Sequence, residues 1–206
     1  MSMNVKNPLP RIDKLRQIMN GRQGLLLTSD LASSNIPRTY LSIMEQNGEI
    51  ERVSRGVYRS ADAFIEDELF SFQSRYGSTI FSHETALYLH DLTDRAPLAY
   101  SITVPSGYHS QFLNNSGHKI VYVSRDLFDL GIILLNTPHG NKVRTTNLER
   151  TICDIMRNRN QIDIQVRNAA LKGYVKNKNR NLNRLQAYAK QFRIQTIVRD
   201  YLEILL

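Results

Sequence analysis

Residues 28–59 read TSDLASSNIPRTYLSIMEQNGEIERVSRGVYR, and this stretch decides the fold of the N-terminal part of the chain. Its start predicts a short helix over residues 28–32, because the hydroxyl of Thr28 or Ser29 can cap the first free backbone N–H groups. The run Ser33-Ser34-Asn35 then predicts a turn, since these side chains compete with helical hydrogen bonds. A short helix followed by such a turn is the first half of a helix-turn-helix.

The second helix of the stretch is predicted to run from Pro37 to about Asn47. Proline suits the first turn of a helix, and Gly48 stands where a helix commonly ends. Winding the segment at about 100° per residue places Leu41 and Met44 on the side that faces the core. The polar residues that face away, or lie on the flank, are Arg38, Thr39, Ser42 and Gln46.

A β-hairpin is predicted next, with strands at residues 50–53 and 57–59 joined by Ser54-Arg55-Gly56. Before the quoted stretch, the apolar spacing of residues 12–19 predicts a helix and residues 25–27 an extended segment. The order is therefore helix, short helix, turn, helix and hairpin. This order is the plan of a winged helix-turn-helix, which we assign to a domain spanning residues 1–60.

The outward face of the second helix has the chemistry of a DNA-reading surface. A recognition helix needs short polar or bidentate side chains near its N-terminal end, and Arg38, Thr39 and Ser42 are of this kind. Tyr40 is expected to reach a phosphate or a sugar, and the hairpin adds arginines for the DNA backbone or minor groove. The candidate DNA-binding residues are Arg38, Thr39, Tyr40, Ser42, Gln46, Arg52, Ser54, Arg55 and Arg59. The alternative is a winged helix that makes only protein contacts.

The charge of the chain also favours a polyanionic partner. The formal net charge is +8, and basic surfaces attract nucleic acids. Residues 1–60 carry nine Lys/Arg against five Asp/Glu, residues 61–156 seven against eleven, and residues 157–206 eleven against three. Two basic ends therefore flank an acidic middle.

The C-terminal basic block predicts a second phosphate-contacting surface, on a basic loop or helix end. Its members are Arg167, Lys172, Lys176, Lys178, Arg180, Arg184, Lys190 and Arg193. Asparagines at alternate positions from 177 to 183 break any continuous helix there. The alternative interpretation is an ordinary solvated helical surface, and the residues alone do not say whether DNA, RNA or a protein partner would meet it.

Residues 61–206 predict a larger mixed α+β domain that ends in helices, so the fold class of the whole chain is α+β. The predicted strands are 100–104, 119–123 and 132–135, and the predicted helices are 62–76, 85–90, one opening at 146–149, 161–176 and 184–204.

Signatures of catalysis or of bound cofactors are not found in the sequence. There is no phosphate-cradling glycine loop, nucleophile elbow or zinc-binding helix motif. Ser82 is interpreted as a helix cap and His83 as a capping or packed histidine, and Cys153 as a core residue. We expect no catalytic residue, no metal and no cofactor. The alternative is a nuclease-like, nucleic-acid-modifying enzyme that uses the winged helix for targeting.

The expected location is the cytoplasm, with no membrane partner. Met1–Pro10 lacks the apolar stretch of a signal peptide, and the longest aliphatic run, Ile132–Leu135, is too short to span a bilayer. The single cysteine, Cys153, excludes an internal disulfide.

Three motifs make residues 10–206 resemble the AbiEi family of antitoxins from abortive-infection systems. The first, after the winged helix, is Phe81-Ser82-His83-Glu84-Thr85-Ala86-Leu87-Tyr88-Leu89-His90-Asp91-Leu92. The second is a strand near Ile102–Pro105, and the third is Glu149-Arg150-Thr151 with Asp154. The chain departs from the family pattern at Asp91, because a glycine often follows the histidine there.

This resemblance implies a bacterial antitoxin and transcriptional autorepressor of type IV, and no enzyme. It implies that the winged helix binds operator DNA with inverted repeats in the promoter of its own operon. It also implies that the C-terminal domain counteracts a cognate nucleotidyltransferase toxin in a phage-defence system, without a tight complex between the two proteins. The operator sequence, the oligomeric state on DNA and the way the toxin is neutralised stay open.

Overall fold

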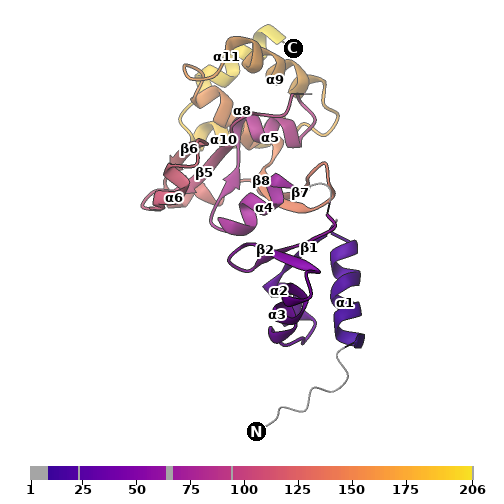
Figure 1. Cartoon of the computed structure of the whole chain (residues 1–206). Coiled ribbons are helices and arrows are strands. Elements are labelled where there is room, and N and C mark those ends of the chain that lie inside the picture. The colour runs from indigo at the N-terminus through magenta and orange to yellow at the C-terminus, as the bar shows by residue number, and fades with distance from the viewer. Residues whose placement is uncertain (1–8, 23, 64–66, 94, 206) are drawn as a thin grey trace. The chain divides into compact units, whose positions relative to one another are not determined.

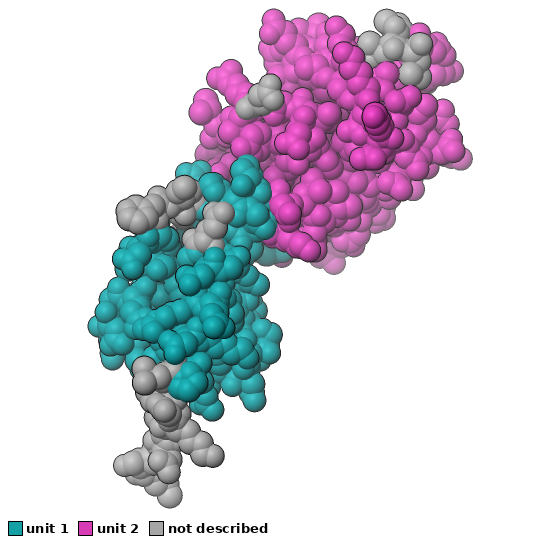
Figure 2. Space-filling model, turned by 90° about the vertical axis from the view of Figure 1, so that its right-hand side faces the viewer, with its two compact units in different colours: residues 1–77, 137–141 teal, residues 78–136, 142–206 magenta. Residues whose placement is uncertain are grey.

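The computed structural model describes residues 9–22, 24–63, 67–93 and 95–205 (Figure 1), without the side chains of Leu9, Ser54, Phe112, Ile204 and Leu205. The chain divides into two compact units, which Figure 2 colours separately. The first comprises residues 1–77 and 137–141, and the second comprises residues 78–136 and 142–206. The first unit thus extends beyond residue 60, where the sequence placed the end of the winged helix.

The first unit has the element order that the sequence predicts for a winged helix-turn-helix. It contains α1 (Leu9–Asn20), β1 (Leu25–Leu27), α2 (Thr28–Ser33), α3 (Thr39–Gln46), β2 (Ile50–Ser54), β3 (Val57–Ser60) and α4 (Glu68–Arg75). The strands form an antiparallel sheet in the order β1-β3-β2, in which Tyr58 lies opposite both Leu26 and Arg52. The mixed α+β class, with an N-terminal winged helix, is confirmed.

The core of this unit follows the apolar spacing of the sequence. Leu15 of α1, Leu26 of β1, Leu31 of α2 and Met44 of α3 are all at most 1% exposed and belong to one cluster. Each such side chain contributes about 1.5–3 kcal/mol by leaving water. Because every element of the winged helix supplies part of this cluster, the elements stabilise one another.

The start of α2 differs from the expected cap. Neither Thr28 nor Ser29 is the cap, because the helix begins at Thr28 and the carboxylate of Asp30 accepts a hydrogen bond from the backbone N of Leu27 at 2.8 Å. The same carboxylate pairs with Arg22 at 2.7 Å. A carboxylate in the first turn of a helix is also favoured by the helix dipole.

The second unit is built on a five-stranded sheet in the order β6-β5-β4-β8-β7. Its strands are β4 (Ile80–Phe81), β5 (Ser101–Pro105), β6 (Lys119–Val123), β7 (Ile132–Asn136) and β8 (Lys142–Thr146). Its helices are α5 (His83–Leu89), α6 (Gln111–Asn114), α7 (Arg125–Phe128), α8 (Leu148–Arg157), α9 (Ile164–Lys176), α10 (Leu182–Gln191) and α11 (Gln195–Leu205). The β4–β8 and β5–β6 pairs are parallel, and the β4–β5 and β7–β8 pairs are antiparallel.

Three predicted strands are confirmed to within one residue, but β4 and β8 were missed. A two-residue strand has no period to detect, and the polar sequence KVRTT of β8 resembles a loop. The predicted helix over residues 184–204 is wrong as a single element, because the chain leaves the helical path at Arg193, whose φ is +58°. The predicted helix over residues 62–76 is observed only as α4, and residues 64–66 lie outside the described residues.

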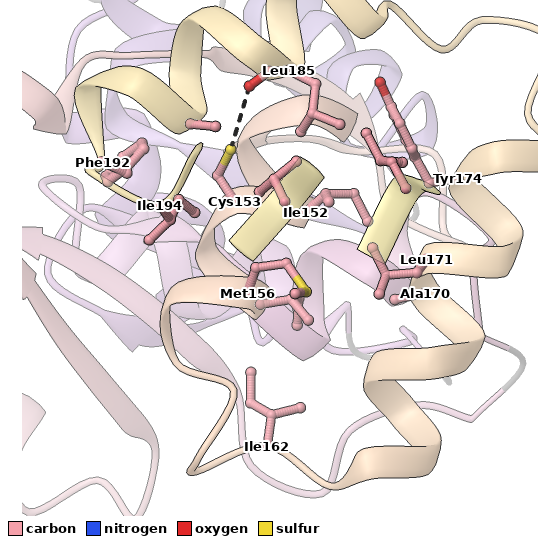
Figure 3. Packing of buried hydrophobic residues seen from close by; sticks show 14 of the residues in the cluster. Ile152, Cys153, Met156, Ile162, Ala170, Leu171, Tyr174, Leu185, Phe192 and Ile194 are labelled. Carbon is pink, nitrogen blue, oxygen red and sulfur yellow. Dashed lines mark hydrogen bonds between the residues drawn. The ribbon is translucent and has the colours of Figure 1, made fainter. Parts of the chain in front are cut away.

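Helix α8 lies at the centre of the second unit, in contact with α5, α9, α10 and α11. Its residues from Glu149 to Met156 are all buried. Cys153 is one of them, and Figure 3 shows its Sγ directed at the carbonyl oxygen of Leu185, 3.9 Å away. Burial raises the pKa of the Cys153 thiol, so it stays protonated and behaves as the core residue that the sequence predicted. Among the described residues, no helix is long and apolar enough to cross a membrane.

Candidate nucleic-acid interface

Helix α3 separates its side chains into a buried face and an exposed face. Tyr40, Leu41 and Met44 are buried, between 1% and 3% exposed, and pack in the core of the first unit. The exposed face carries Arg38, Thr39, Ser42, Glu45 and Gln46. The predicted polar residues of this helix are thus brought together on one surface, except Tyr40.

Tyr40 does not fit the expectation that it reaches DNA. Its side chain is 2% exposed, and its hydroxyl accepts a hydrogen bond from Nη1 of Arg11 at 3.5 Å. The Arg11 guanidinium also lies 5.7 Å from the centre of the Tyr40 ring. Tyr40 therefore ties α3 to α1, and we drop it from the candidate interface.

The wing is attached to α2 through its turn. Gly56 has a φ of +81°, and its carbonyl oxygen accepts a hydrogen bond from the backbone N of Thr28 at 2.9 Å. A Cβ at Gly56 would lie 2.9 Å from Oγ1 of Thr28, so both the conformation and the space require glycine. The register of the β2–β3 pair shifts between Arg52 and Ser54, as in a bulge. These features hold the turn, and with it Arg55, at one end of the sheet.

The three arginines of the wing differ in their surroundings. Arg55 and Arg52 are exposed, whereas the side chain of Arg59 is 30% exposed and forms an ion pair with Glu51 on the neighbouring strand. Arg59 is therefore partly neutralised, and Arg55 is the wing arginine best placed for phosphate. The predicted contact by Ser54 concerns a side chain that lies outside the described residues.

Glu45 is a residue of the exposed face that the sequence analysis missed. It follows Ser42 by three positions and Arg38 by seven, so the three side chains lie along one stripe of α3. Cations and small polar groups are the usual signals of a DNA-reading helix, and a lone glutamate among them is not one of these signals. Helical periodicity alone could have placed it on this face.

The second basic surface is only partly assembled. Lys172 and Lys176 on α9, and Lys178 and Arg180 in the connector between α9 and α10, are exposed. Arg167 does not join them, because its Nη1 donates to the carbonyl oxygen of Arg159 at 3.3 Å and its guanidinium lies 5.4 Å from the Tyr201 ring centre. Lys190 and Arg193 are exposed at the far end of α10, about 12 Å along the helix from its start.

Buried Glu149 holds the connector in place. Its carboxylate accepts hydrogen bonds from the backbone N of Asn181 at 2.8 Å, from the Tyr174 hydroxyl at 3.3 Å and from Nη1 of Arg184 at 3.4 Å. Burial and this carboxylate raise the pKa of the Tyr174 hydroxyl. Arg184 is thus partly engaged, and Glu149 of the Glu-Arg-Thr motif is a positioning residue for the basic connector.

Arg150 of the same motif is fully buried, and its contacts are internal. Its Nε donates to both carboxylate oxygens of Asp154, at 2.9 and 3.0 Å. Its Nη1 donates to the carbonyl oxygens of Leu127 and Leu130, and its guanidinium lies 4.5 Å from the Phe192 ring centre. The motif therefore joins α7, α8 and α10 and has no group directed at solvent.

His83 is a packed histidine, as the sequence predicted. It adopts a φ of +48°, with Nδ1 2.8 Å from Oγ of Ser82 and Nε2 2.7 Å from Nδ2 of Asn158. Burial lowers the pKa of its imidazole. Ser82 precedes α5 as expected, but its hydroxyl bonds to His83 and to Thr103 and does not cap the helix. Among the described residues, no group of three or more His, Cys, Asp or Glu side chains is arranged to hold a metal ion.

Comparisons with known proteins agree with this geometry. Residues 13–61 match the family described as "Transcriptional regulator, AbiEi antitoxin", a span that covers α1 to the end of the wing. No curated protein matches the chain. The fold is similar to that of the RV2827C protein from Mycobacterium tuberculosis, with a TM-score of 0.56 and 12% sequence identity over 90% of this chain and 72% of the other. Residues 13–61 are thus similar to the AbiEi family of transcriptional regulators and antitoxins, in agreement with the resemblance that the sequence indicated.

Proposed function

We propose that this protein is a cytoplasmic autorepressor that binds inverted repeats in the promoter of its own operon. The observation that carries the proposal is the exposed face of α3, where Arg38, Thr39, Ser42 and Gln46 project away from a fully packed core. Among the described residues, none of these four side chains forms a hydrogen bond or an ion pair, so they are available for base edges in the major groove.

The wing supplies affinity in this proposal. Arg55 and Arg52 are exposed on the hairpin, where they contact phosphates or the minor groove and set the register of α3 on the duplex. Arg59 contributes less because it is paired with Glu51. Phosphate contacts give affinity without sequence information, and the side chains of α3 choose the operator.

The second unit has two roles in the proposal. Lys172, Lys176, Lys178 and Arg180 add phosphate contacts that strengthen binding without selecting a sequence. The unit also counteracts a nucleotidyltransferase toxin during phage defence, without a tight complex and without catalysis of its own. Both roles extend the family description, which names a regulator and antitoxin.

The test measures binding of the full chain to duplex DNA from upstream of its own gene, at several salt concentrations. Arg38→Ala with Ser42→Ala should remove the preference for this DNA over an unrelated duplex, because both side chains lie on the exposed face. Lys14→Ala is the matched control, since Lys14 is exposed and belongs to α1 instead of α3. Binding without any sequence preference or salt dependence in the wild-type protein would contradict the proposal.

The antitoxin role is tested separately, by growth of cells that express the adjacent toxin gene. The Arg38/Ser42 variant should still rescue growth, because the exposed face of α3 belongs to the first unit. Loss of rescue by a variant that is still folded would show that the two activities do not divide between the two units.

A further inference from the structure

The acidic residues of the winged helix are unevenly paired. Among described residues 9–22 and 24–60, four of the five carboxylates form an ion pair with an arginine: Asp13 and Glu49 with Arg16, Asp30 with Arg22, and Glu51 with Arg59. Across the described parts of the chain, Glu45 forms no such pair, and its side chain is exposed. The residues three and four positions away on α3 and beyond it are Leu41, Ser42, Gly48 and Glu49, none of which is basic.

This unpaired carboxylate lies on the same stripe as the candidate base-reading residues. Arg38, Ser42 and Glu45 succeed one another at steps of four and three residues, which superimposes them along one side of a helix. Tyr40 and Met44 lie on the buried side of α3, turned away from this stripe. Glu45 therefore faces whatever Arg38 and Ser42 face.

A carboxylate on a DNA-facing surface has few favourable positions. Near a phosphate it meets a like charge, which is destabilising even when water screens it. Guanine presents the acceptors O6 and N7 in the major groove, and thymine presents the acceptor O4, so both repel a carboxylate. Adenine presents the N6 amine, which is a donor, but its N7 acceptor lies beside that amine. Cytosine presents the N4 amine, a donor that glutamate recognises in the major groove.

We propose that Glu45 is a specificity-determining residue whose carboxylate accepts a hydrogen bond from the N4 amine of a cytosine in the operator. The inference rests on the proposed function, because it requires α3 to lie in the major groove. Glu45 also disfavours binding to unrelated DNA, since its charge is left without a partner wherever no cytosine is present.

The spacing along α3 predicts where this cytosine lies. Arg38 precedes Glu45 by seven residues, which is about 10.5 Å of helix. This length corresponds to about three base-pair steps of about 3.4 Å. Because arginine pairs best with guanine, each half-site should contain a guanine and a cytosine about three steps apart.

The experiment selects bound duplexes from a randomised library with the full-length wild-type protein, Glu45→Gln and Asp62→Asn. The last variant is the matched control, because Asp62 is exposed and its change removes one negative charge from the same unit. Wild-type protein and Asp62→Asn should select a motif with one invariant cytosine. Glu45→Gln should select the same motif except at that position, where the preference for cytosine is lost or moves to adenine, because glutamine pairs with N6 and N7 of adenine. Its preference for cytosine over thymine there should fall about ten-fold or more.

Two results overturn the inference, and they are distinguishable from each other. If the wild-type protein selects no motif, the proposed operator binding itself fails. If the wild-type protein selects a motif and Glu45→Gln keeps every position with unchanged discrimination, operator binding stands and the role of Glu45 is wrong. Thermal unfolding checks the fold of each variant. All three proteins should unfold at nearly the same temperature, because the side chains of Glu45 and Asp62 are exposed.

Discussion

The carboxylate of Asp67 accepts a hydrogen bond from the side-chain amide of Asn141 at 2.9 Å, across 74 positions of the chain. The same carboxylate accepts from the hydroxyl of Thr137 and from the backbone N of Phe70, the second of these at the start of α4. All these residues belong to the first compact unit, and Asp67 is 2% exposed. One buried side chain thus attaches the segment 137–141 to the first unit.

Asp67→Ala should lower the free energy of unfolding by about 2–4 kcal/mol, because it leaves buried donors unpaired and removes the cap of α4. Urea unfolding followed by circular dichroism gives this difference. Asp62→Asn serves as the control, since that carboxylate is exposed and its loss should change stability little. An Asp67→Ala protein as stable as the wild type would show that the three hydrogen bonds do not order the segment.

The buried pair of Arg150 and Asp154 predicts a strongly non-additive result. Arg150→Met alone leaves the Asp154 carboxylate buried without its partner, which should cost about 3–5 kcal/mol of stability. Asp154→Leu alone should cost a similar amount for the same reason. The double variant should cost clearly less than the two single changes added together, because no unpaired charge remains. Additive losses in chemical unfolding would mean that the pair is not coupled.

The winged helix could be predicted because its signals are local. Pro37 at the start of the second helix and Gly48 after it mark boundaries within a few residues of the observed ones, α3 being Thr39–Gln46. The exposed face of α3 also follows from periodicity alone, which placed Ser42 and Gln46 correctly. The place of Tyr40 was predicted wrongly because tyrosine is amphipathic and suits either the buried or the exposed face of a helix. Its contact with Arg11 involves a separate helix, α1, so the local sequence of α3 gives no sign of it.

The C-terminal basic surface could be predicted only in part, because its charges are modified by residues far away in the sequence. Arg184 is engaged by Glu149, 35 positions earlier, and Arg167 is covered by the Tyr201 ring. Neither contact leaves a local pattern. The connector itself was foreseen, since Asn177 ends α9 and Asn181 caps α10 by accepting from the backbone N of Arg184.

The buried imidazole of His83 predicts a loss of stability in mild acid. Its pKa is lowered in the folded protein, so the unfolded chain binds a proton more readily than the folded chain. Stability is therefore unaffected by this group above the unfolded pKa of about 6.5, and it falls as the pH drops below that value. His83→Asn should reduce the acid sensitivity between about pH 6.5 and 5, because asparagine tolerates the positive φ and carries no titrating group.

Unfolding free energies of the wild-type and His83→Asn proteins, measured at several pH values, check this prediction. His139→Asn is the matched control, because it removes one imidazole from the other compact unit of the chain. Identical pH dependence in the wild type and His83→Asn would contradict the role given to His83.

The second basic surface makes the last prediction, which concerns the salt dependence of DNA binding. Each lysine or arginine that neutralises a phosphate of duplex DNA adds about 0.9 to the slope of log affinity against log salt concentration. Replacing Lys172, Lys176 and Arg180 with glutamine should therefore lower the slope by up to about 2.7, provided that all three contact phosphates. The set of bases selected from a random library should stay the same, because phosphate contacts carry no sequence information.

The matched control replaces Arg95, Arg125 and Lys142 with glutamine, which removes the same charge from exposed positions of the same unit. Its slope should stay close to that of the wild-type protein. Equal decreases in both triple variants would indicate a general effect of net charge and no defined surface. A different result would be that the Lys172/Lys176/Arg180 variant keeps the wild-type salt slope but no longer rescues growth of cells that express the toxin. That result would assign these three residues to the antitoxin activity and not to DNA binding.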